Sequence, residues 1–153
     1  VWSASVLKHL ADAGHEIALT WHSKGGGTFG LISQNNEVRP VADLLMLLNR
    51  HMAGAKRVAS RSSNEFVEIL ASQDEESYCV MVINKTAEEQ EVKLTLLNGP
   101  LADPDPFARP VLNYEISGAQ QNYEQRNIVF FDSDFQGTLT MKPYSIQFLV
   151  FQK

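Results

Sequence analysis

SIQFLVF, at residues 145–151, places apolar side chains at every second position, at Ile146, Phe148 and Val150. A period of two is typical of a β-strand, whose side chains point alternately to its two faces. EVKLTLL, at residues 91–97, shows the same alternation. Both stretches therefore predict strands that bury one face in a core.

Six further stretches after Gly54 have the same character, and segments rich in Asn, Asp, Gly, Pro and Glu separate them. Together we expect eight strands, at residues 57–61, 65–71, 78–84, 91–97, 109–116, 127–131, 138–141 and 145–151. Eight short strands in about 100 residues predict a mainly β fold, an antiparallel β-sandwich in which two sheets share one core.

The first third of the chain has a helical period instead. Trp2, Val6, Leu10 and Ala13 recur three or four residues apart and predict a helix over residues 3–13 with these residues on its apolar face. A second helix is expected from residue 41 to residue 52, with Pro40 in its first turn, where a missing N–H costs nothing.

Between these helices lies the short apolar run IALTW, at residues 17–21, which is typical of a strand buried on both faces of a parallel sheet. The following residues, 23–30, contain four glycines and predict a flexible loop. One parallel strand with two amphipathic helices leaves strand edges and apolar faces uncovered. We therefore expect residues 1–54 to be the terminal α-β-α element of a (β/α)8 barrel, and residues 55–153 to be a C-terminal β-sandwich domain that closes its own core.

Composition and charge exclude several classes of partner. The 153 residues include 13 Lys and Arg against 18 Asp and Glu, a net charge of −5, so no basic surplus favours nucleic acid. The longest apolar run, residues 44–48, is too short to cross a membrane, and the first residues do not have the charged-then-apolar pattern of a leader. Cys79 is the only cysteine, and its apolar surroundings predict a small buried side chain. The chain starts with Val1 rather than Met, and we expect it to be a piece of a longer protein whose cellular location stays open.

Several phrases resemble retaining glycoside hydrolases built on a (β/α)8 barrel, above all the β-xylosidase and α-L-iduronidase group and the α-L-arabinofuranosidases. Agar- and porphyran-degrading barrels with appended sandwiches are also similar. The phrases that resemble the last barrel strand, loop and helix are WH at 21–22, GTFGLI at 27–32, VRP at 38–40 and LLMLLNR at 44–50. The phrases that resemble strands of the C-terminal sandwich are VMVINK at 80–85 and KPYSIQFL at 142–149.

The resemblance implies that the parent protein hydrolyses O-glycosides with two carboxylates, which in such enzymes follow the fourth and seventh barrel strands. The resemblance implies that this chain begins after the seventh strand, so neither catalytic residue is expected in it, and no cofactor or metal is implied. The missing N-terminal barrel and the carbohydrate substrate of the parent are the expected partners. The loop at residues 23–38 contains one acid, Glu37, which we interpret as a first-turn charge of the following helix.

Trp21 and His22 are the candidate substrate-binding residues. The resembled enzymes carry an aromatic residue at the end of the last barrel strand as the floor of a sugar subsite, and an indole stacks well on the apolar face of a sugar. The alternative is that Trp21 is a core residue of the barrel. His22 either donates a hydrogen bond to a sugar hydroxyl or is only solvated.

Two other groups of residues suggest weaker sites. Acidic turns at residues 74–76 and at Asp132 and Asp134 have the oxygen ligands of a calcium site, although charged turns are usually solvated. Tyr114, Tyr123 and Phe135 suggest a carbohydrate-binding face, although aromatic residues in strands mostly pack in the core. The alternative function is therefore a non-catalytic β-sandwich that binds carbohydrate or another partner.

Overall fold

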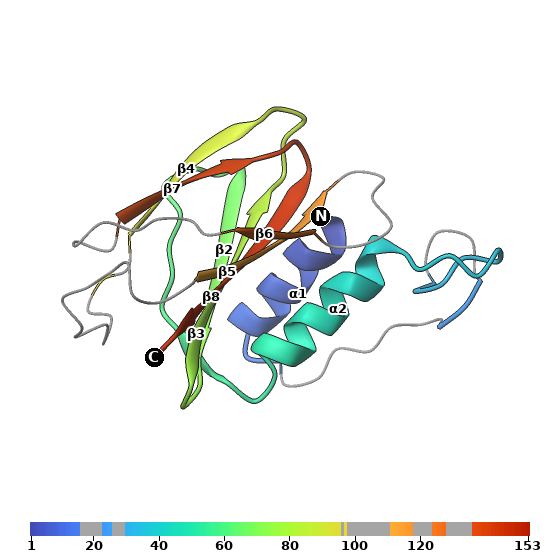
Figure 1. Cartoon of the computed structure of the whole chain (residues 1–153), viewed down its shortest axis with the longest axis horizontal. Helices are drawn as coiled ribbons and strands as arrows, with labels where there is room; N and C mark the ends of the chain where they lie inside the picture. Colours follow the sequence, from blue (N-terminus) through green and yellow to red (C-terminus); the bar gives the residue numbers. More distant parts are fainter. Residues whose placement is uncertain (16–22, 26–29, 96, 98–110, 118–123, 128–135) are drawn as a thin grey trace.

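A computed structural model describes residues 1–15, 23–25, 30–95, 97, 111–117, 124–127 and 136–153. These residues form three layers: two helices, a six-stranded sheet and a two-stranded sheet (Figure 1). The elements are α1 (Trp2–Asp12), α2 (Pro40–His51), β1 (Lys56–Val58), β2 (Val67–Gln73), β3 (Ser77–Asn84), β4 (Gln90–Thr95), β5 (Val111–Ser117), β6 (Glu124–Asn127), β7 (Gln136–Met141) and β8 (Ser145–Gln152).

Both sheets are antiparallel throughout, as the sequence pattern predicts. The larger has the order β1-β2-β3-β8-β5-β6, and the smaller pairs β4 with β7. Seven of the eight expected strands occur within a few residues of their predicted bounds. The remaining strand, β6, begins three residues earlier than expected, and the predicted segment beyond Asn127 lies outside the described residues.

The strands β3 and β8 lie at the centre of the larger sheet, with Met81 opposite Phe148. Alternate side chains of this pair enter two different cores, because the helices cover one face of the sheet and the β4–β7 pair covers the other. The core on the helix side contains Ala4, Leu44, Leu47, Leu70, Cys79, Met81, Ile83, Tyr114, Ile116, Ile146, Phe148 and Val150. The core between the sheets contains Val67, Ala71, Val80, Val82, Leu94, Val111, Leu139, Met141, Leu149 and Phe151.

The helix layer changes one expectation. We expected residues 55–153 to close their own core, but one of the two cores is completed by side chains of α1 and α2. Without the helices, one face of the larger sheet, including Tyr114, Ile116 and Phe148, loses its cover. The period of two does not reveal this, because alternation predicts one buried face, whereas β3 and β8 are buried on both faces.

The buried face of α1 differs from the predicted one. Ala4 is fully buried against the sheet with Leu7 and Ala11 packed beside it, whereas Trp2 is 76% exposed. The spacing of Ala4, Leu7 and Ala11 is as helical as that of the predicted face. Small alanines allow a helix to approach a sheet closely, so α1 packs through its smaller apolar residues and turns the larger Trp2 to the surface.

Helix α2 begins at Pro40, its first helical residue, as predicted, and packs through Leu44 and Leu47. Figure 1 shows α1 and α2 running in the same direction on one face of the sheet. Two consecutive helices with the same direction require a segment that returns between them. The predicted strand at residues 17–21 belongs to this connection and lies outside the described residues. No described helix is long and apolar enough to span a membrane.

Candidate functional site

Trp21 and His22, the candidate substrate-binding residues, lie outside the described residues, and the structure resumes directly after them at Ser23. The amide of Ile32 donates to the Ser23 carbonyl oxygen at 3.0 Å, and the amide of Gly25 donates to the Ile32 carbonyl oxygen at 2.9 Å. Lys24 and Ile32 thereby form an isolated parallel bridge. Residues 23–25, which follow Trp21 and His22, are thus hydrogen-bonded to Ile32, and we call this pair of backbone segments the loop base.

Two glycines make this loop base close-packed. Gly25 has a φ of +76°, a conformation that residues with a side chain rarely adopt. At Gly30, a Cβ atom would lie 2.4 Å from the Gly25 carbonyl oxygen, so only glycine allows the two backbones to approach this closely. The glycine-rich composition therefore has a steric function at the loop base.

Glu37 does not belong to the first turn of the helix, contrary to our interpretation. The helix starts at Pro40, and Glu37 closes a tight turn in which its amide donates to Ser33 Oγ at 3.1 Å and its carbonyl oxygen accepts from the Ser33 amide at 2.8 Å. The acid in the first turn of α2 is Asp43. The proline already marks the start of this helix, and Glu37 precedes Pro40 in a turn of its own.

Arg39 connects the loop to α2. Its side-chain Nη1 donates to the Gly30 carbonyl oxygen at 3.1 Å, and its amide donates to the Leu31 carbonyl oxygen at 2.9 Å. Arg39 is also the residue that precedes the first helical residue, Pro40. The described part of the loop is therefore held between the Ser23 end and the helix that packs on the sheet.

The sequence of this loop contains a single acid. Glu37 is the only acid in residues 23–38, and its carboxylate lies at 3.5 Å from the hydroxyl of Ser33 within its own turn. Retaining glycosidases need a pair of carboxylates about 5 Å apart. A single acid within a turn does not supply such a pair, so residues 23–38 alone do not contain both carboxylates of a retaining glycosidase.

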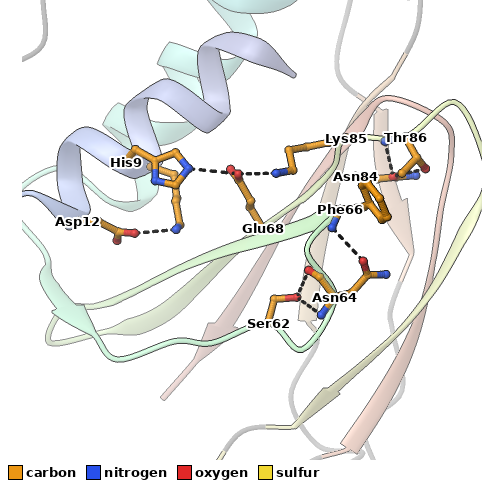
Figure 2. Close-up of polar contacts among 10 residues, drawn as sticks. His9, Asp12, Ser62, Asn64, Phe66, Glu68, Asn84, Lys85 and Thr86 are labelled. Carbon is orange, nitrogen blue, oxygen red and sulfur yellow. Dashed lines mark hydrogen bonds and ion pairs between the residues drawn. The ribbon is translucent and has the colours of Figure 1, made fainter.

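A second polar cluster joins α1 to the larger sheet (Figure 2). Glu68 of β2, 9% exposed, accepts hydrogen bonds from Lys85 Nζ at 2.8 Å and from His9 Nε2 at 3.2 Å. Burial raises the pKa of Glu68, but hydrogen bonds from Lys85, Ser5 and His9 outweigh this effect and lower the pKa to about 2. The Glu68 carboxylate is therefore ionised across the physiological pH range and holds α1 to β2 and to the residue after β3.

The C-terminal turn of α1 has its own ionic contacts with the sheet. Asp12 forms ion pairs with Lys8 of the same helix, at 2.6 Å, and with Arg57 of β1. Arg57 Nη1 also donates to the Ala11 carbonyl oxygen at 3.3 Å. The hydrogen bond from Lys8, with the charges of Lys8 and Arg57, keeps the pKa of Asp12 below its usual value. Both clusters connect α1 to the larger sheet.

A fully buried acid, Glu115, lies between the two sheets. Lys142 Nζ lies 2.8 Å from its Oε1, and Gln147 Nε2 donates to its Oε2 at 3.1 Å and to the Thr140 carbonyl oxygen at 2.9 Å. Asn113 Nδ2 donates to Gln147 Oε1 at 3.2 Å. These partners compensate for burying the charge, so the network links the sheets and is structural.

The weaker predictions have mixed outcomes. The Asp74 carboxylate accepts hydrogen bonds from the amides of Glu76 and Ser77 within its own turn, and Asp132 and Asp134 lie outside the described residues. Among the described residues, no three His, Cys, Asp or Glu side chains are grouped to hold a metal. Cys79 is buried as predicted, and burial raises the pKa of its thiol to about 12.

Tyr114, predicted as part of a carbohydrate-binding face, is 4% exposed and packs against His51 with ring centroids 5.4 Å apart. It therefore belongs to the core on the helix side, while Tyr123 and Phe135 lie outside the described residues. Sequence reasoning missed His9 and Glu68. The available signal was a glutamate inside the apolar strand segment VEILA, at residues 67–71.

Comparison with solved structures finds the same fold within larger enzymes. An endoxylanase of glycoside hydrolase family 30 from Clostridium papyrosolvens is 19% identical, with a TM-score of 0.65 over 88% of this chain and 32% of its own. A family 30 subfamily 8 xylanase from Clostridium acetobutylicum is 14% identical, with a TM-score of 0.67 over 84% of this chain and 32% of its own. At these identities the similarity is one of fold.

A third similar structure is the catalytic domain of a family 30 xylanase from Talaromyces cellulolyticus, 15% identical, with a TM-score of 0.65 over 86% of this chain and 29% of its own. The chain thus spans about a third of the length of the solved structures that it matches. No protein-family model matches the sequence, and no curated protein matches it.

Proposed function

We propose that this chain is the C-terminal part of a carbohydrate-active enzyme, an O-glycoside hydrolase, whose catalytic carboxylates lie outside it. The observation that carries the proposal is the extent of the fold match, which covers 88% of this chain but only 32% of a family 30 endoxylanase. The match therefore includes most of both the helical region and the sandwich, in the context of a larger enzyme.

The arrangement of the helices supports the same proposal. In a (β/α)8 barrel, successive helices run in the same direction because a strand returns between them. Helices α1 and α2 have this relation, and the apolar run at residues 17–21 lies between them in sequence (Figure 1). We infer that residues 1–54 complete a barrel supplied by the rest of the protein, and that the sandwich braces it through the shared core and the Glu68 cluster.

We further propose that Trp21 forms part of a sugar subsite and that His22 donates a hydrogen bond to the substrate. The support is the position of the two residues, because the Ser23 backbone next to them is hydrogen-bonded to Ile32 at the start of a close-packed loop. A backbone held in one conformation limits the movement of the attached aromatic ring, and this favours stacking of the ring on a sugar.

The test is made in the longer protein that contains this chain. Trp21→Ala removes the platform, and loss of a desolvated stacking contact is expected to lower kcat/KM on a xylan or aryl glycoside by roughly tenfold or more. Trp21→Phe keeps most of the stability and lowers kcat/KM less. His22→Ala is expected to have the smaller effect of one lost hydrogen bond.

Melting temperature separates binding from folding in this test, because removing a buried aromatic also destabilises a core by about 3 to 5 kcal/mol. The inhibition constant of a sugar-shaped inhibitor should rise together with the loss in kcat/KM. A stably folded Trp21→Ala protein with unchanged kcat/KM and unchanged inhibitor affinity would make Trp21 a core residue of the barrel.

A further inference from the structure

Two half-exposed aromatic residues lie at the same end of the six-stranded sheet. Phe66, 52% exposed, directly precedes β2, and Tyr144, 54% exposed, directly precedes β8. The residues that follow β3 lie between them: the Lys85 amide donates to the Phe66 carbonyl oxygen at 3.0 Å, and the Tyr144 amide donates to the Thr86 carbonyl oxygen at 2.9 Å. The two aromatic backbones are therefore about two strand spacings, roughly 10 Å, apart.

The backbone conformation of Tyr144 is unusual for a residue with a large side chain. Its φ is +47°, and it follows Pro143 in the turn between β7 and β8. Turns with proline in the second position and a positive φ in the third favour glycine or asparagine there. A tyrosine is strained at this position, and its exposed ring returns little packing energy. Residues with strained backbone conformations cluster at active sites and ligand-binding sites.

The charges around the two rings disfavour an anionic ligand. The ammonium group of Lys85 is paired with the buried Glu68 carboxylate at 2.8 Å (Figure 2). The neighbouring turns carry the exposed acids Glu65, Glu88 and Glu89. This combination suits a neutral ligand with apolar ring faces for the aromatic residues and hydroxyl groups that donate to carboxylates.

We propose that Phe66 and Tyr144 form a binding surface for a neutral polysaccharide chain, which lies across the turn at residues 85–86. The surface is distinct from Trp21 and does not depend on the proposed function, because both aromatics belong to the sandwich. Each ring stacks on the apolar face of one sugar, and the turn between them sets the distance between the two stacked sugars.

Affinity electrophoresis of the 153-residue chain in gels that contain soluble xyloglucan, a neutral polysaccharide, tests the proposal. Phe66→Ala and Tyr144→Asn should each weaken binding about five- to tenfold, the effect of losing one stacking contact. Tyr144→Asn should also melt at the same or a higher temperature, because asparagine tolerates a positive φ. Retained stability with lost binding is a combination that a purely structural tyrosine does not produce.

Trp2→Ala is the matched control, because Trp2 is another exposed aromatic, on α1, and its loss should leave binding unchanged. Three results would overturn the proposal: no retardation of the unmodified chain by xyloglucan, unchanged retardation of a folded Tyr144→Asn chain, or an equal loss of binding in Trp2→Ala. Equal retardation by anionic polygalacturonate would also count against a surface selective for neutral chains.

Discussion

At the residue scale, Glu68 has the best-defined electrostatic role. The pKa of its carboxyl is about 2 in the folded chain, against a reference value of 4.5, because Lys85 and His9 donate to the charged form. A pKa that is lower in the folded state contributes stability above the unfolded pKa, and this contribution is lost as the pH falls through the folded pKa. The difference corresponds to a free energy on the order of 3 kcal/mol.

We therefore expect Glu68→Gln to lower the free energy of unfolding at pH 7, by up to that amount. Between pH 4.5 and pH 2 the unmodified chain should lose stability more steeply than the variant, because only the unmodified chain has this carboxyl to protonate. Urea denaturation at a series of pH values measures both effects, with the exposed Glu65→Gln as control. Parallel stability curves for Glu68→Gln and the unmodified chain would show that the cluster contributes nothing.

Gly30 gives a steric prediction for the loop base. Gly30→Ala places a Cβ atom 2.4 Å from the Gly25 carbonyl oxygen, so the backbone segments around Gly25 and Gly30 must move apart. The Ile32 amide, which donates to Ser23 across this base, should then exchange its hydrogen faster. Gly54→Ala is the control, because it adds only the cost of a positive φ, about 1 kcal/mol, with no atom within 4 Å. Unchanged exchange at Ile32 in Gly30→Ala would mean that the base tolerates a side chain.

At the element scale, the positions of the strands could be predicted from the sequence, but the way the helices pack against them could not. Alternation locates strands because it depends on neighbours within one segment. The same reasoning could not identify the buried face of α1. Two apolar faces of the helix, one with Trp2 and one with Ala4, have the same helical spacing. Which face is buried depends on how closely the helix approaches the sheet. The acid Glu37 was misplaced for a related reason, since its turn is defined by contacts with Ser33.

The shared core predicts that the helices and the sandwich unfold together. Leu47 of α2 is fully buried on the helix side of the large sheet, and Leu139 of β7 is 2% exposed on the other side. Leu47→Ala and Leu139→Ala should each lower the free energy of unfolding by about 2 to 5 kcal/mol. Circular dichroism and tyrosine fluorescence should report one coincident transition in both variants. A strand transition that is unaffected by Leu47→Ala would instead show that the sandwich folds by itself.

At the scale of the whole molecule, we propose that this chain braces a barrel supplied by the rest of the protein, and that the catalytic carboxylates lie outside it. The described acids with defined contacts are in structural clusters: Glu68 and Asp12 at α1, Glu115 between the sheets, and Glu37 and Asp74 in turns. The sequence alone suggested this arrangement through its resemblance to barrel enzymes. It proposed Trp21 as part of a sugar subsite and left a core position as the alternative, because the other walls of such a subsite would belong to a different part of the protein.

Hydrolysis by the 153-residue chain itself is the most direct test of the central claim, that its catalytic carboxylates lie elsewhere. Reducing-sugar release from xylan and turnover of a panel of aryl glycosides should not exceed the blank, since retaining chemistry requires two carboxylates that we propose lie outside this chain. The longer protein should hydrolyse a member of the same panel. Turnover by the isolated chain that survives repurification, and that disappears when one of its own acids is changed, with Glu37→Gln tried first, would contradict the account.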